Sequence, residues 1–126
     1  MNLVGIKFNK IDAYRSESMD MRGSDVRIKL TKLEQKREDT ALIHFVYRLD
    51  FKENVGYLAL HGYSILNGTK SEMSAAALKW KKTKRLPEDV EKPLVSMISA
   101  TSTTASVFAG HTLGFVPPFA PVTARV

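Results

Sequence analysis

The chain has 126 residues, no cysteine and a formal net charge of +6 at pH 7. This length indicates one domain, 1–126, with a core large enough to fold without disulfide or metal staples. The lack of cysteine excludes disulfide and thiolate chemistry, and the positive charge permits acidic partners. The N-terminal segment lacks the apolar core of a signal peptide, and no apolar run approaches membrane-spanning length. We therefore expect a cytosolic protein with no segment inserted in a membrane.

Two alternating segments near the start of the chain predict strands at about 3–14 and 25–34. In the first segment the alternation shifts phase between Phe8 and Ile11, which is typical of a β-bulge, here at Asn9-Lys10. The second segment alternates apolar with charged residues more regularly. Charges on a strand discourage pairing with other chains, so this strand is expected near an edge of the sheet.

The stretch Thr40 to Leu66 predicts a long hairpin with strands at 40–51 and about 55–66. One side of each strand is rich in β-branched and aromatic residues, yet the other side is also apolar. We place five side chains on this second face: Leu42, Val46, Leu58, Leu60 and Leu66. One helix layer covers one face of a sheet, so the second face predicts a homo-oligomer or a bound ligand.

The period then changes from two to that of helices. Thr69 and Glu72 have the spacing of a capping box, which predicts a helix at about 70–82 with Trp80 on its apolar side. A second helix is expected at about 88–110, with an apolar stripe that includes Thr101. Three prolines in 114–126 predict an extended tail after this helix. Together these elements predict a two-layer α+β fold, a four-stranded antiparallel sheet followed by two helices.

No catalytic motif is present in the sequence. The three histidines, His44, His61 and His111, have no carboxylate or second histidine at a metal-ligand spacing. The glycines stand singly and form no phosphate-binding loop, and no nucleophile elbow is present. We therefore expect a protein that is not an enzyme and that has neither a metal site nor a cofactor.

A basic cluster surrounds the single tryptophan near the end of the first helix. It consists of Lys79, Trp80, Lys81, Lys82, Lys84 and Arg85. These residues suggest a nucleic-acid contact in which cations bind phosphates and the indole stacks on a base. The alternative is structural, because lysines complement the dipole at a helix C-terminus and Trp80 falls on the apolar stripe. We favour the structural interpretation.

The order of elements and the tail resemble those of the SecB-type export chaperones. In that family four antiparallel strands and two helices precede a tail of the form Gly-x-Phe-Pro-x-Leu-x-Leu-x-Pro-Val. The segment from Gly114 to Val122 looks like a variant of this tail, and Tyr57 to Gly68 also resembles the corresponding strand. The resemblance implies a sheet backed by a long helix, a dimer of dimers, and grooves that bind unfolded polypeptide without ATP.

The functional prediction is therefore an ATP-independent holdase for unfolded or preprotein polypeptides. Its candidate peptide-binding residues are Leu42, Val46, Leu58, Leu60, Phe115 and Phe119. SecB proteins dock on the SecA motor through an acidic surface, and we do not expect that docking in a chain with a net charge of +6. Two alternatives stay open, a nucleic-acid-binding module that uses Lys79–Arg85 and a structural homo-oligomer without a client.

Overall fold

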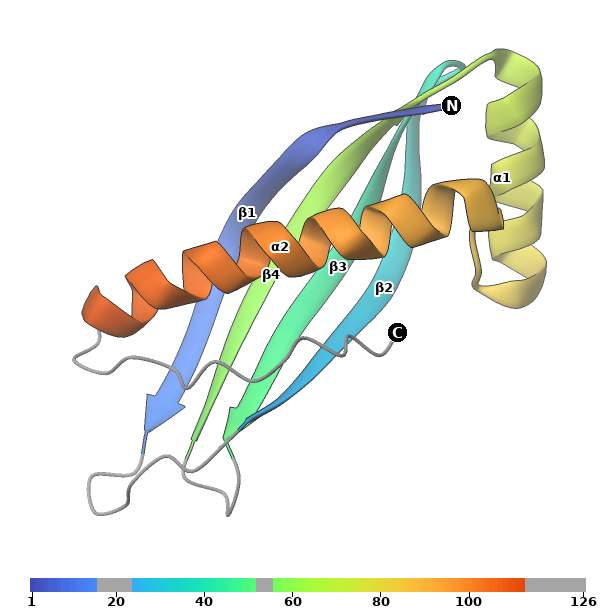
Figure 1. Ribbon diagram of the computed structural model, residues 1–126. Coiled ribbons are helices and arrows are strands. Elements are labelled where there is room, and N and C mark those ends of the chain that lie inside the picture. Colours follow the sequence, from blue (N-terminus) through green and yellow to red (C-terminus); the bar gives the residue numbers. More distant parts are fainter. Residues whose placement is uncertain (16–23, 52–55, 113–126) are drawn as a thin grey trace.

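The computed structural model describes residues 1–15, 24–51 and 56–112, and it contains four strands followed by two helices (Figure 1). The strands are β1 (Asn2–Arg15), β2 (Ser24–Arg37), β3 (Thr40–Phe51) and β4 (Gly56–Asn67). The helices are α1 (Lys70–Thr83) and α2 (Glu88–Thr112). The predicted α+β class, with an antiparallel sheet before two helices, is confirmed; the predicted tail 114–126 lies outside the described residues.

The strands form one antiparallel sheet in the order β1-β4-β3-β2. β1 and β2 are therefore the two edges, and the prediction of an edge position for β2 is confirmed. The register of β1 against β4 is irregular between Leu3 and Ile6 and between Phe8 and Lys10. The second irregularity confirms the predicted bulge at Asn9-Lys10.

The register of the central hairpin differs from the predicted one. Tyr47 pairs with Leu60 and Leu49 with Leu58, so odd-numbered residues of β3 share a face with even-numbered residues of β4. Leu58, Leu60 and Leu66 consequently lie in the core, each 0% exposed. Leu42 and Val46 lie on the opposite face, and the prediction of one shared second face is wrong.

Helix α2 crosses one face of the sheet and contacts all four strands (Figure 1). Val90, Leu94 and Ile98 are buried in the core that it forms with this face. Further along α2, the predicted Thr101 is exposed and Ser102 and Ser106 are buried instead. Serine carries a short side chain, so these positions let the helix backbone lie near the strands.

Helix α1 begins and ends with the local signals of its sequence. The hydroxyl of Thr69 accepts the backbone N–H of Glu72 at 3.2 Å, and the Glu72 carboxylate accepts the N–H of Thr69 at 3.0 Å. This confirms the capping box, and the hydrogen bond from the Thr69 backbone lowers the pKa of Glu72. Lys84 ends the helix in the left-handed conformation, with φ 57°.

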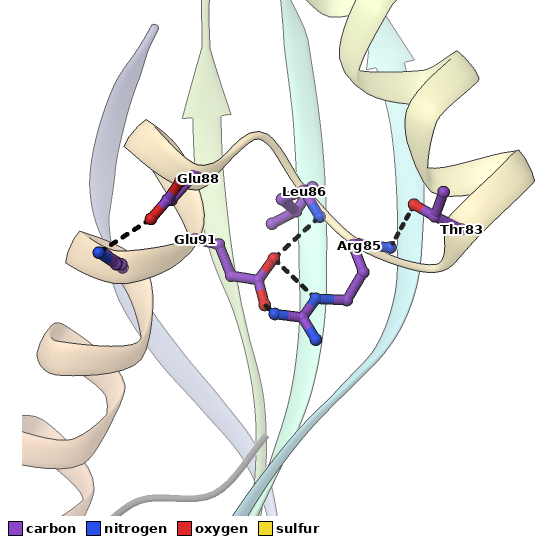
Figure 2. Close-up of polar contacts among 6 residues, drawn as sticks. Thr83, Arg85, Leu86, Glu88 and Glu91 are labelled. Carbon is purple, nitrogen blue, oxygen red and sulfur yellow. Dashed lines mark hydrogen bonds and ion pairs between the residues drawn. The ribbon is translucent and has the colours of Figure 1, made fainter.

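Glu91 joins the two helices (Figure 2). Its carboxylate accepts the backbone N–H of the buried Leu86 at 3.2 Å. The same carboxylate pairs with the guanidinium of Arg85 through two contacts, of 2.9 and 3.2 Å. A bidentate pair of this kind fixes both distance and orientation, so Glu91 holds the 84–87 connection against the start of α2.

Candidate functional site

The two edges of the sheet carry different side chains. Exposed cations lie along β2, among them Arg27, Lys29, Lys32 and Lys36. β1 instead exposes large apolar side chains: Val4 is 50% exposed and Ile11 is 54% exposed. Charged residues protect an edge from pairing with other chains, whereas exposed apolar residues on a long edge favour such pairing. β1 is therefore the edge with the features of a binding site.

A hollow of about 560 Å³ lies between β1 and α2. It is lined by Phe8, Ala100, Thr101, Thr104 and Ala105. Ile11 pairs with the core residue Leu60, so its side chain lies on the same, helix-covered face of the sheet. The free edge of β1 and an apolar hollow thus adjoin each other, and an added strand would have both main-chain partners and a place for side chains.

Two aromatic rings hold β1 in place beside this hollow. Phe8 packs edge-to-face on Phe45, with ring centroids 6.1 Å apart. Gly62 lies between them in the register, paired with Phe8 on one side and Phe45 on the other. The absence of a side chain at Gly62 makes room for the close approach of β1.

The face of the sheet opposite α2 is open in the described part of the chain. Leu42 and Val46 lie there with Tyr63 and Ile65, all partly exposed. Each histidine on this face has a carboxylate partner at 3.2 Å, Glu34 for His44 and Asp12 for His61.

Lysines surround these carboxylates. Hydrogen bonds from Lys36 and Lys32 hold the pKa of Glu34 at about 2. Lys10 lies 3.5 Å from Asp12. Among the described residues, no three histidine or acidic side chains are arranged to hold a metal ion.

The structure separates the predicted peptide-binding residues. Leu58 and Leu60 are in the core beneath α2, and Leu42 and Val46 are on the open face. These four side chains cannot form one groove floor, and that part of the prediction is wrong. Phe115 and Phe119, the predicted wall, lie outside the described residues.

The basic cluster does not form the predicted stacking platform. Trp80 is 7% exposed and packs in the core with Met73, so its indole cannot receive a base. Arg85 is engaged by Glu91. The exposed members are Lys79, Lys81, Lys82 and Lys84. This placement supports the structural interpretation of the cluster.

A second hollow, of about 680 Å³, lies between the end of α1 and the first turns of α2. Its apolar wall is formed by Leu86 and Val95, and its rim includes Lys79, Arg85 and Lys92. Two of the rim cations have acidic partners, since Lys92 pairs with Glu88 at 2.9 Å and Arg85 with Glu91. All the described residues that line this hollow belong to α1, α2 or the connection between them, so its lining offers an added chain no strand to pair with.

Sequence reasoning missed Val4 and Ile11 as surface residues. Their positions in an alternating apolar pattern resemble those of core residues, and only the strand order places them at an edge. The one available signal was the smaller number of charges in 3–8 than in the second strand.

The geometry defines a two-layer α+β protein with a densely charged β2 edge, a β1 edge that exposes Val4 and Ile11, and an open sheet face. Comparison of the chain with protein-family models, curated proteins and solved structures finds no match in any of the three. Neither helix in 1–15, 24–51 and 56–112 has the length and apolar character needed to cross a membrane.

Proposed function

We propose that the protein is an ATP-independent holdase that binds unfolded polypeptides along the β1 edge. The observation that supports this function is the combination of a 14-residue edge strand with exposed Val4 and Ile11 and the apolar hollow beside α2. The resemblance to SecB-type chaperones suggested a holdase from the sequence. The binding residues proposed now differ from those that the sequence suggested.

In the proposed complex, an extended client adds a strand next to β1. Main-chain hydrogen bonds to the groups of β1 that no described strand pairs with supply affinity that is independent of the client sequence. Alternate client side chains point toward the helix side, where Phe8, Ile11 and Ala105 would contact them. Apolar burial is non-directional, so many different clients fit the same surface.

The expected affinity is moderate. Burial of one client leucine or phenylalanine contributes roughly 1.5–3 kcal/mol. A few such side chains, with the main-chain hydrogen bonds, offset the entropy lost on association and reach micromolar affinity, about −8 kcal/mol. Such a complex releases its client without an energy source, which is consistent with a function that requires no nucleotide.

The test uses Ile11→Lys, because Ile11 is exposed and its replacement leaves the core intact. A buried lysine ammonium beside a client strand loses hydration, so we expect this variant to lose most of its suppression of aggregation of a reduced, unfolded client. Leu78→Lys on α1 is the matched control, since Leu78 is 55% and Ile11 54% exposed. Equal activity of the two variants would mean that the client binds at a site other than the β1 edge. A wild type that neither slows aggregation nor co-elutes with client would refute the holdase function.

A structural homo-oligomer is the second candidate, and the same exposed edge favours it. Two copies can pair their β1 edges about a two-fold axis and so remove both free edges at once. Native mass measurements on the same proteins separate the candidates. The structural role is supported if the protein binds no client and forms a dimer or tetramer that Ile11→Lys dissociates. The holdase is supported if the mass increases only after client is added.

A further inference from the structure

The open face of the sheet carries more cations than its carboxylates can neutralise. Asp12 pairs with Lys10, Asp50 with Arg48, and Glu34 with both Lys32 and Lys36. The fourth carboxylate of this face, Asp25, is the register partner of Asp50. The cations of this face that have no ion pair with a described residue include Lys7, Arg27 and Lys29. The register brings them to the same face as Tyr63, Arg48 and Val46 respectively.

Two of the arginines lie directly opposite each other. Arg27 on β2 is the register partner of Arg48 on β3, and Asp25 is the partner of Asp50. Like charges in directly opposed positions destabilise a sheet. Arg48 is partly compensated by Asp50, 2.9 Å away, but Arg27 has no carboxylate of the described residues within 4.0 Å. An anion bound over this pair would relieve the repulsion between the two guanidinium groups.

Aromatic rings lie between the cations. Tyr57 and Tyr63 are on the inner strand β4, and Tyr14 is on β1. The guanidinium of Arg48 lies 4.5 Å over the centroid of the Tyr57 ring, and the Tyr14 ring is 6.4 Å from that of Tyr57. A hollow of about 270 Å³ is lined by Tyr14 and Tyr57, by Arg27 and Arg48, and by the carboxylates Asp25 and Asp50. Rings and guanidinium planes at the centre of a sheet are surfaces on which unpaired bases stack.

We propose that the open face of the sheet binds single-stranded nucleic acid. The phosphates contact Arg27, Lys29 and Lys7, and bases stack on Tyr57, Tyr63 and the exposed Tyr14. This site shares no residue with the β1–α2 hollow and lies on the opposite face, so it does not depend on the proposed holdase function.

The charge of the face excludes the other simple occupants. A second copy would bring the same excess of cations against the first, and the two faces would repel each other. An acidic polypeptide would satisfy the cations but would leave the tyrosine rings without a specific role. Duplex nucleic acid keeps its bases stacked on one another, whereas single strands offer both phosphates and free base planes.

The test is the anisotropy of labelled oligothymidylate and oligouridylate as a function of salt. Arg27→Gln/Lys29→Gln removes two exposed cations from the open face, and Lys81→Gln/Lys82→Gln removes two exposed cations from α1 as the matched control. We expect the first double variant to reduce the magnitude of the salt slope by about 1.4, because each phosphate contact on a single strand contributes about 0.7. The control should retain the wild-type slope and affinity.

A second pair of variants tests the rings. Tyr57→Leu/Tyr63→Leu should weaken binding by roughly fivefold or more per lost stacking contact, and Tyr57→Phe/Tyr63→Phe should restore it. Heparin and polyglutamate, which have charge but no bases, should compete weakly. Equal loss with both cation variants, loss only with Lys81→Gln/Lys82→Gln, no effect of the leucine variants, or no binding at low salt would each overturn the proposal.

Discussion

Replacement of Leu60 with alanine is expected to lower the free energy of unfolding by about 2–5 kcal/mol. Leu60 is 0% exposed in the core beneath α2, where it lies across from Tyr47. The substitution removes the transfer free energy of the lost carbons and leaves a cavity that the surrounding strands can only partly fill. Urea unfolding monitored by circular dichroism measures the change.

Leu42→Ala is the matched control, because it removes the same atoms from the adjoining strand. Leu42 lies on the open face and is only partly buried, so the expected loss is about 1 kcal/mol or less. The register predicts this asymmetry, since Leu42 pairs with Ile65 and Leu60 with Tyr47. Equal losses at the two sites would mean that the two leucines share one environment, as in the register expected from the sequence.

Gly62→Ala is expected to destabilise the protein by about 1–3 kcal/mol and to loosen β1 in particular. A Cβ at this position would overlap the carbonyl oxygen of Lys7 and approach Cζ of Phe45 to 3.1 Å. The nearest atom belongs to the backbone, so it cannot move away without a shift of β1. In an ordinary strand, alanine is at least as favourable as glycine, and the sign of this effect therefore reports the close approach.

Gly68→Ala provides the comparison for this prediction. A Cβ at Gly68 would meet Cγ of Met1 at 2.7 Å and Sδ of Met73 at 3.3 Å, both in flexible side chains. Because methionine adapts to such changes, we expect a smaller loss, of less than about 1 kcal/mol. Hydrogen exchange should show faster exchange of β1 amides in Gly62→Ala than in Gly68→Ala. Unchanged protection of β1 in Gly62→Ala would contradict the packing described for this edge.

The two proposed sites place different demands on the sheet. A client strand requires the backbone of β1 to be free at its outer edge, and a nucleic acid requires only the side chains of the open face. The double variant Arg27→Gln/Lys29→Gln should therefore suppress client aggregation as the wild type does. Ile11→Lys should bind oligonucleotides as the wild type does. Both assays can be run on the same preparation of each variant, so each function can be tested independently of the other.

The elements whose causes are local could be predicted from the amino-acid sequence. The capping box of Thr69 and Glu72 sets the start of α1, because the hydroxyl and carboxylate need only the neighbouring backbone. The bulge at Asn9-Lys10 was visible as a change of phase, and the charged alternation of β2 correctly indicated an edge. Short-range periodicity was enough to predict four strands, two helices and the α+β class.

Which strand faces lie on the same side of the sheet depends on long-range pairing, and the fold was needed to identify them. The pairing of Phe51 with Gly56 joins an odd to an even position, and a change of one residue in this register would have turned Leu58 and Leu60 to the other face. The insertion of β4 between β1 and β3 left Ile11 at an edge and brought Asp12 to His61, 49 residues away. Long-range pairing depends on the combined packing of the whole sheet against α2, and no local pattern specifies it. The surfaces available for binding follow from that pairing, so they could be located only after the fold was known.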